Sequence, residues 1–126
     1  MWLSLISVFV GSGLGGVLRF LTAFFMQSSS FGSSRWTLPW STLIVNIAGC
    51  FLFGLIYGFA LQSLINKEFK LALTTGFCGG LTTFSTFSYE ILEMFGSGRI
   101  WSGIAYAAIS LGAGVAAAWC GYALTR

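Results

Sequence analysis

Long stretches without a charged side chain constrain what this chain can fold into more than any other feature of its sequence. Trp2–Met26 carries only Arg19, and Trp36–Asn66, Leu71–Tyr89 and Ile100–Thr125 carry no charge at all. Each stretch is close to the roughly 20 residues that a helix needs to cross the hydrocarbon core of a bilayer. Irregular backbone facing lipid would leave its peptide groups unpaired, so these stretches predict membrane-spanning helices.

The expected fold is an all-α integral membrane protein with four transmembrane helices. A chain of 126 residues has room for one domain, with spans at approximately 2–26, 36–64, 71–94 and 100–124. Its composition agrees, because 56% of the residues are apolar and 7% are charged, whereas soluble domains are roughly a quarter charged. The five tryptophans lie toward the span ends, where an indole ring can reach the headgroups. The three cysteines show no paired zinc spacing, and we interpret them as apolar filler.

The basic residues give the chain little preference for one orientation. If the amino terminus is cytoplasmic, the six of them divide equally, Lys67, Lys70 and Arg126 on one side and Arg19, Arg35 and Arg99 on the other. Since the Lys/Arg bias of short loops sets orientation, the chain is expected to insert both ways. Two opposed copies can then pair about an axis in the membrane plane as an antiparallel homodimer. The alternative is that an equal division of so few charges has no meaning.

Enzymatic chemistry has little support in the residue types present. The chain has no His and no Asp, so it lacks a histidine base, a Ser-His-Asp triad and a His/carboxylate metal site. Gly11–Gly16 (GSGLGG) matches a dinucleotide fingerprint formally, but no strand precedes it and no acidic residue follows at the required distance. These glycines, with Gly112 and Gly114, are expected to let helices approach closely. The basic residues form no patch, so nucleic acid is not an expected partner.

Few strongly polar side chains fall inside the spans, and each is a candidate functional group because burying charge in a bilayer is costly. They are Arg19 in the first span, Asn46 in the second, Glu90 near the end of the third, and Tyr106 and Ser110 in the fourth. The alternative for Arg19 is snorkelling to the interface. The alternative for Asn46 is a hydrogen bond between helices.

The stretch Gly76–Glu90 (GFCGGLTTFSTFSYE) concentrates small polar groups in the third span. Gly79 and Gly80 weaken a helix and the threonines after them compete for backbone hydrogen bonds, so the span is expected to break near its midpoint. Such a break is tolerated only where its peptide groups are buried in protein or line a wet cavity. Unwound carbonyls without a nearby carboxylate would make a modest cation site.

The residues after the break suit an anion. Phe84 and Phe87 share a helical face, and their ring edges carry partial positive charge. Hydroxyl and amide donors surround them in the sequence: Thr82, Thr83, Ser85, Thr86 and Ser88, with Thr42 and Asn46 from the second span. Donors without a fixed charge bind an anion and still release it, which conduction requires, while Arg19 attracts anions near a mouth. Ordinary helix packing is the alternative for this run.

Three motifs make the chain resemble the Fluc (CrcB) fluoride channels over essentially its whole length: GSGLGGVLRF (11–20), TLIVNIAGCFLFG (42–54) and GFCGGLTTFSTFSYE (76–90). The resemblance implies an antiparallel dual-topology homodimer in the bacterial cytoplasmic (inner) membrane, with two fluoride pores and a central structural Na⁺. It implies passive export of cytoplasmic fluoride, and hence fluoride resistance.

The resemblance also implies roles for individual residues. Phe84 and Phe87 are similar to the rings whose edges face fluoride, and Asn46 to the pore asparagine. The carbonyls of Gly79 and Thr82 resemble the sodium ligands. The fluoride pathway predicted from the residues and the resemblance together comprises Arg19, Thr42, Asn46, Thr83, Phe84, Ser85, Phe87, Glu90, Tyr106 and Ser110.

Two other functions compete with a fluoride channel. A small multidrug-resistance type exporter also has four helices and dual topology, but it needs a carboxylate deep in the first span, where this chain has Arg19. A structural membrane subunit would use the glycines for assembly alone and would leave Asn46 and the hydroxyl cluster without a role.

Overall fold

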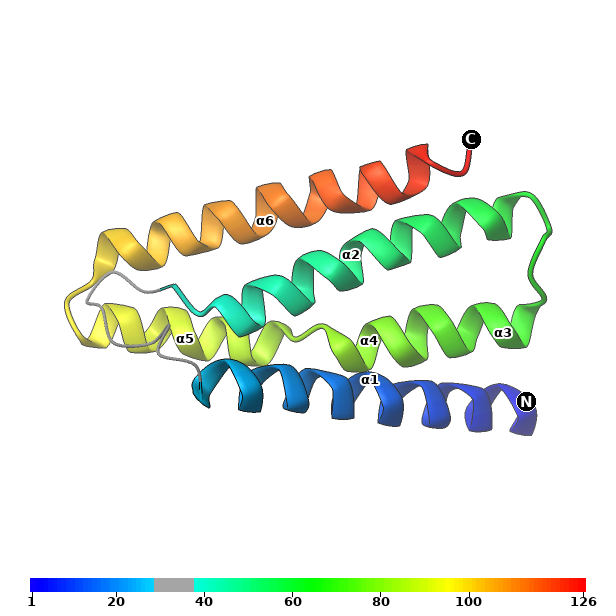
Figure 1. Cartoon of the computed structure of the whole chain (residues 1–126), viewed down its shortest axis with the longest axis horizontal. Coiled ribbons are helices and arrows are strands. Elements are labelled where there is room, and N and C mark those ends of the chain that lie inside the picture. Colours follow the sequence, from blue (N-terminus) through cyan, green and yellow to red (C-terminus); the bar gives the residue numbers. More distant parts are fainter. Residues whose placement is uncertain (29–37) are drawn as a thin grey trace.

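The computed structural model describes residues 1–28 and 38–126 as antiparallel helices, with both termini at the same end (Figure 1). Its elements are α1 (Trp2–Ser28), α2 (Trp40–Leu61), α3 (Lys67–Leu71), the π-helical segment η2 (Ala72–Cys78), α4 (Gly79–Leu81), α5 (Phe84–Gly96) and α6 (Ile100–Ala123). The segments from α3 to α5 together form the third helix, so the predicted four-helix, all-α fold is confirmed for the described residues. Arg35 and Trp36 of the sequence predictions lie outside these residues.

Three helices of the described chain are long and apolar enough to cross a membrane: α1, α2 and α6. The third helix is interrupted, as predicted. Thr82 and Thr83 have extended backbone, with φ/ψ of −82°/155° and −148°/119°, and α5 starts immediately after them. Figure 1 shows the interruption as a short straight segment between α4 and α5.

The glycine pair does not make the break itself, which corrects the expected cause. Gly79 is right-handed helical, with φ −64° and ψ −36°, and Gly79 and Gly80 together begin α4. A Cβ on Gly80 would meet the Ser12 carbonyl of α1, so this glycine serves close packing. The two threonines that follow interrupt the helix.

Close backbone contacts join the helices in two pairs. Gly11 and Gly15 of α1 lie against backbone atoms of the third helix, as the small-residue spacing predicts. Between α2 and α6 the close approaches are made by Gly54 and Gly121. Gly112 has no atom within 4 Å of an added Cβ, so the expected packing role is not found for it within the described chain.

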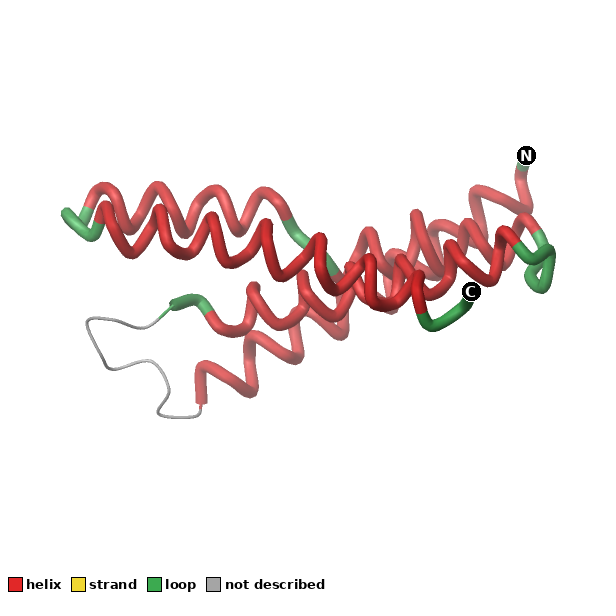
Figure 2. Tube along the Cα trace, turned by 90° about the horizontal axis from the view of Figure 1, so that it is seen from above, coloured by secondary structure: helices red, strands yellow, loops and turns green. Residues whose placement is uncertain are grey.

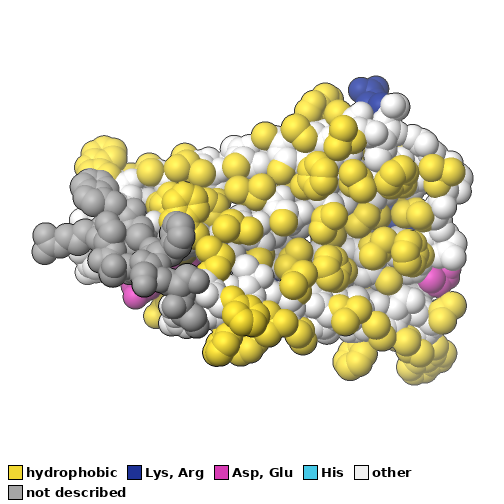
Figure 3. Space-filling model, viewed as in Figure 1, with side chains coloured by type: hydrophobic (Ala, Val, Ile, Leu, Met, Phe, Trp, Pro, Cys, Tyr) yellow, Lys and Arg dark blue, Asp and Glu magenta, His cyan; other side chains and the backbone are white. Residues whose placement is uncertain are grey.

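The bundle opens toward the end where α5 and α6 connect. Seen from above, the α5–α6 hairpin leans away from the last turns of α1 and the first turns of α2 (Figure 2). Side chains of Leu43, Met94 and Tyr106 form the buried core of this half. Apolar side chains are spread over the face shown in Figure 3, as they are in a protein whose surroundings are lipid or another apolar subunit.

Candidate functional site

Asn46 closes the gap that the break leaves in the third helix. Its Nδ2 donates to the Thr83 carbonyl at 3.2 Å, and its Oδ1 accepts from the Thr83 amide at 2.8 Å. The Asn46 side chain thus pairs both the N–H and the carbonyl of Thr83, and only this orientation of its amide does so. Asn46 thus forms a hydrogen bond between helices, which was the alternative to a role in function, and it does so at the break. One Nδ2 hydrogen of Asn46 remains free of these two bonds.

Most hydroxyls of the cluster form hydrogen bonds with backbone groups of the third helix. Thr82 Oγ1 donates to the Cys78 carbonyl at 2.8 Å, and Ser88 Oγ donates to the Phe84 carbonyl at 2.9 Å. Thr83 is the N-cap of α5, since its Oγ1 accepts from the Thr86 amide at 3.2 Å. These hydroxyls form hydrogen bonds with backbone groups near the break. Fewer of them than expected are therefore available to an ion.

One hydroxyl of the cluster keeps a proton for a ligand. Thr83 Oγ1 donates to Thr86 Oγ1 at 3.0 Å, so the Thr86 proton remains available. Because the Thr83 proton is used in this way, Ser85 Oγ is the donor in its long contact of 3.4 Å with Thr83 Oγ1. Thr86 lies just past the break, two residues after Phe84.

The broken end of α4 carries carbonyl groups with different partners. Arg19 Nε donates to the Gly80 carbonyl at 3.1 Å, which places a positive group at the negative end of this half-helix. Cys78 O accepts from Thr82. The carbonyls of Gly79 and Thr82 receive no donor from the described residues, because the Thr83 amide bonds to Asn46 and the Thr86 amide to the Thr83 side chain.

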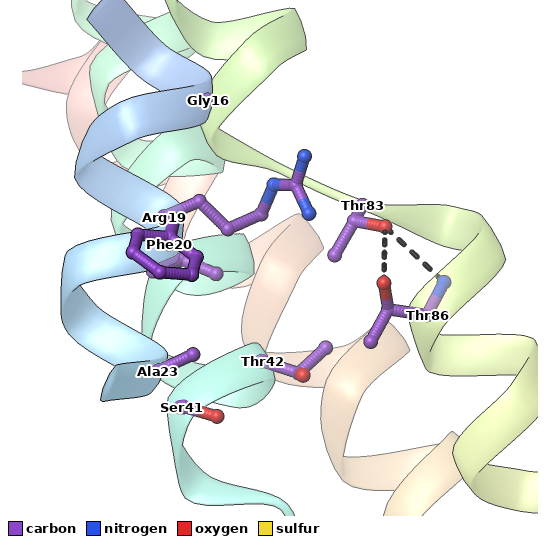
Figure 4. Close-up of a pocket in the computed structure, with 9 residues that line it drawn as sticks. Gly16, Arg19, Phe20, Ala23, Ser41, Thr42, Thr83 and Thr86 are labelled. Atoms are coloured by element: carbon purple, nitrogen blue, oxygen red, sulfur yellow. Dashed lines mark hydrogen bonds between the residues drawn. The ribbon is translucent and has the colours of Figure 1, made fainter. Parts of the chain in front are cut away.

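A cavity of about 290 Å³ opens on the side of Arg19. It lies between α1, the start of α2 and the break, and Figure 4 shows the Arg19 guanidinium directed toward Thr83. Thr42 and Thr86 also line it. Arg19 is half-buried and bonded to Gly80, so it does not snorkel; it makes one wall of this cavity electropositive.

A second cavity of about 280 Å³ opens on the other side of the break. Its lining joins the second, third and fourth helices: Asn46, Cys50, Thr82, Thr83, Phe84, Phe87, Ser110 and Leu111. The rings of Phe84 and Phe87 are 5.9 Å apart and inclined by 41°. Phe87 packs on the Tyr106 ring at 5.2 Å, which holds its position.

Ser110 has the clearest unmet bonding capacity at this cavity. Its Oγ is buried and makes no hydrogen bond within the described structure. An unpaired buried hydroxyl costs free energy, so such a group usually serves a ligand or a water molecule.

Glu90 is held from two helices at once. Thr42 Oγ1 of α2 donates to its Oε1 at 2.6 Å, and the Tyr106 hydroxyl of α6 donates to its Oε2 at 2.7 Å. Thr42 and Tyr106 are 5% and 0% exposed, so both bonds are shielded from solvent. Thr42 was expected to offer its hydroxyl beside Asn46, but in this structure that hydroxyl is engaged by the carboxylate.

The structure thus divides the predicted pathway residues between two cavities that share Thr83. Arg19 and Thr42 lie on one side, and Asn46, Phe84, Phe87 and Ser110 lie on the other. Ser85, Tyr106 and Glu90 line neither cavity in the described chain, and the hydrogen bond between Tyr106 and Glu90 connects α6 to α5.

Cys50 is a lining residue that the sequence interpretation missed. It borders the Phe84 cavity and also a hollow of about 410 Å³ around Gly79, Thr82 and Cys78. Cys50 follows Asn46 by four residues and shares its helix face, so helical spacing would have identified it.

These features define a small multi-pass helical membrane protein with a broken helix, whose break is flanked by two small cavities. Residues 6–122 match the family model described as CrcB-like protein, Camphor Resistance (CrcB), so the chain belongs to the CrcB (Fluc) family. Relatives named fluoride-specific ion channel FluC match over nearly their whole length. The Clostridium perfringens protein is 43% identical, covering 97% of this chain and 94% of its own. The FluC 2 protein of Rhodococcus jostii is 39% identical, covering 98% and 99%, and the Flavobacterium psychrophilum protein is 37% identical, covering 93% and 92%.

Proposed function

We propose that this chain is a fluoride-specific ion channel of a bacterial cytoplasmic membrane, and that it lets cytoplasmic fluoride leave passively. Family membership and the names of its relatives support this function. Such a protein is a transporter and performs no enzymatic reaction. A proton-coupled cation exporter has no support, because it would need a carboxylate in its first span. The first span of this chain carries Arg19 and no carboxylate.

The observation that carries the proposal is the set of donors around the break. Ser110 and Thr86 have protons available, Asn46 has one amide hydrogen left, and the phenylalanines offer ring edges. None of these groups is charged, so together they replace part of the water shell of a small anion without trapping it. Arg19 attracts anions to the neighbouring cavity, and its charge is shared with the Gly80 carbonyl.

We assign Glu90 an indirect part in the pathway. Both of its oxygens accept hydrogen bonds, from Thr42 and from Tyr106, so these two donors fix the position of the carboxylate. Tyr106 in turn supports the ring of Phe87. Glu90 therefore holds the positions of groups that contact the ion. If Tyr106→Phe in purified protein leaves the fluoride efflux rate unchanged, this assignment is wrong.

Exposure around the break supports an antiparallel homodimer with two pores. Phe84 is 80% exposed in the single chain, and Gly79, with its unpaired carbonyl, is exposed as well. Lipid cannot pair a carbonyl, so a second subunit is the natural cover. The equal division of basic residues supplies the two opposed orientations.

The unpaired carbonyls also support a structural Na⁺ at the centre of this dimer. Two oxygens from each chain, those of Gly79 and Thr82, would surround the ion without a carboxylate. We expect replacement of Na⁺ by N-methylglucamine to lower the thermal midpoint of the purified protein. An unchanged midpoint, with no sodium found in the washed protein by elemental analysis, would rule the ion out.

The decisive experiment measures fluoride and chloride release from liposomes with ion-selective electrodes while an ionophore clamps the potential. We expect rapid fluoride release without chloride release, and loss of fluoride release in Phe84→Ile and Phe87→Ile with assembly preserved. Phe9→Ile is the matched control, because Phe9 is 78% exposed but lies on α1 away from the break. No release from a well-folded wild type would reject the channel and return the exporter to consideration.

A further inference from the structure

Three aromatic rings and two cations form a continuous row at the end of the molecule that holds both termini. Lys70 Nζ lies 6.0 Å from the ring centroid of Tyr57, and Arg126 Cζ lies 5.4 Å from that of Tyr122. The two tyrosine rings are 6.0 Å apart, and the ring of Trp119 is 6.0 Å from Tyr122. These five residues, here called the terminal array, join α2, α3 and α6.

Packing of the last residues holds Arg126 in this row. The Gln62 side chain of α2 donates to the Thr125 carbonyl. The Thr125 hydroxyl occupies the space beside Gly58, where a Cβ would collide with it, and donates to the Tyr122 carbonyl at 2.7 Å. Thr125 is 7% exposed, so the segment before Arg126 is firmly seated on α2. The position of the guanidinium over Tyr122 follows from this seat.

Both cations lack an anionic partner inside the described chain. Neither Lys70 nor Arg126 forms an ion pair with a carboxylate of the described residues, although Glu68 lies two positions before Lys70. A cation on the face of a ring keeps its outer side free for an anion. The row thus presents two unpaired positive groups in a constrained arrangement.

The depth of the array indicates where its anion comes from. Tyr57 lies four residues before the end of α2, and Tyr122 lies next to the last residue of α6, which is the level of the headgroups for spanning helices. Exposed apolar side chains border it, with Trp119 at 62%, Leu61 at 58% and Leu124 at 70%. A ligand here meets positive charge at one end and apolar surface at the other, which is the chemistry of a phospholipid.

We propose that the terminal array binds the phosphodiester headgroup of an anionic phospholipid. The positive charges of Lys70 and Arg126, at the two ends of the row, attract the phosphate, and Trp119 with its apolar neighbours contacts the acyl chain. Basic residues between transmembrane helices at headgroup level recognise anionic lipids in this way. The site is separate from the break and does not depend on which ion the protein conducts.

The test counts lipid bound to the purified protein in neutral detergent by native mass spectrometry, with phosphatidylglycerol and phosphatidylcholine as probes. We expect phosphatidylglycerol to bind more tightly, and Lys70→Gln and Arg126→Gln each to weaken it by about fivefold. Lys67→Gln is the matched control, since Lys67 belongs to the same short helix but makes no ring contact, and it should bind like wild type.

Further variants separate the array from general charge attraction. Lys70→Arg and Tyr122→Phe keep the cation and the ring and should keep binding, whereas Tyr122→Leu should weaken it. Equal binding of phosphatidylcholine, or an equal loss in Lys67→Gln, would overturn the proposal. Displacement of phosphatidylglycerol by an equal concentration of inorganic phosphate would identify free phosphate as the ligand and would also reject the lipid site.

Discussion

Asn46 contributes to both the stability of the break and the proposed pathway. Its amide satisfies the N–H and the carbonyl of Thr83 with two hydrogen bonds, and it borders the cavity that contains Phe84 and Phe87. In a membrane no water replaces these bonds, so losing them leaves two peptide groups unpaired. A substitution at this position therefore changes folding and transport together.

We expect Asn46→Ala to lower the free energy of unfolding by about 2 kcal/mol, because two hydrogen bonds of about 1 kcal/mol each are lost. Fluoride efflux should fall with it. Unfolding in denaturant and efflux from liposomes measure the two effects. Asn66→Ala is the control: Asn66 caps α3 through the Phe69 amide, far from the break, and its loss should leave efflux unchanged. Wild-type efflux from Asn46→Ala would contradict the assignment of Asn46 to the pathway.

Residue types were easier to predict from the sequence than their bonding partners. Asn46, Phe84 and Phe87 stood out because polar or paired aromatic groups are unusual inside an uncharged span. The hydroxyls did not divide as expected, since Thr82, Thr83 and Ser88 bond to their own backbone. Which acceptor an O–H finds depends on backbone geometry, and a sequence pattern does not contain that geometry.

At the scale of elements, the third helix is the one that departs from regular structure. Its first half contains the π-helical segment η2 and ends with α4, and its second half restarts at Phe84. Thr83 starts α5 as an N-cap, while Arg19 bonds to a carbonyl at the end of α4. The break therefore has side-chain partners on both of its ends, which makes it a defined structural element.

We expect Thr83→Ala to destabilise the protein by about 1 kcal/mol, the usual cost of losing an N-cap, and to slow fluoride efflux by loosening the start of α5. Thr83→Ser keeps the capping oxygen and should behave like wild type. Thermal unfolding in detergent and liposome efflux distinguish the two variants.

Ser88→Ala is the control for this pair, because the Ser88 hydroxyl bonds only within its own helix. It should change neither quantity measurably. If Thr83→Ser were as impaired as Thr83→Ala, the cap would not explain the role of Thr83.

The whole molecule exposes its proposed working parts on its surface. Phe84 and the Gly79 carbonyl would face lipid in an isolated chain, and apolar side chains are spread over the face shown in Figure 3. We therefore expect a pore lined by Phe84 to need a second copy of the chain. The balance of basic residues makes two opposed copies accessible to one sequence.

We expect charge-biased variants to be inactive alone and active together. Arg35→Gln/Arg99→Gln removes positive charge from one side, and Lys67→Gln/Arg126→Gln removes it from the other, so each should insert in a single orientation. Co-expression should restore fluoride resistance to a sensitive host, and membrane labelling should report the orientations. Full activity of either variant alone, with its orientation shown to be uniform, would reject the antiparallel dimer.

The sequence by itself determined that this protein lies in a membrane, that it is all-helical, and that its small polar residues gather in Gly76–Glu90. These properties depend on the order of apolar and polar residues along the chain, so they can be read before folding. Only the tertiary structure decided that Asn46 bonds to Thr83, 37 positions away, that Glu90 is shared by Thr42 and Tyr106, and that Arg19 bonds to Gly80. Hydrogen bonds need atoms within about 3 Å, and the approach of distant helices sets such distances.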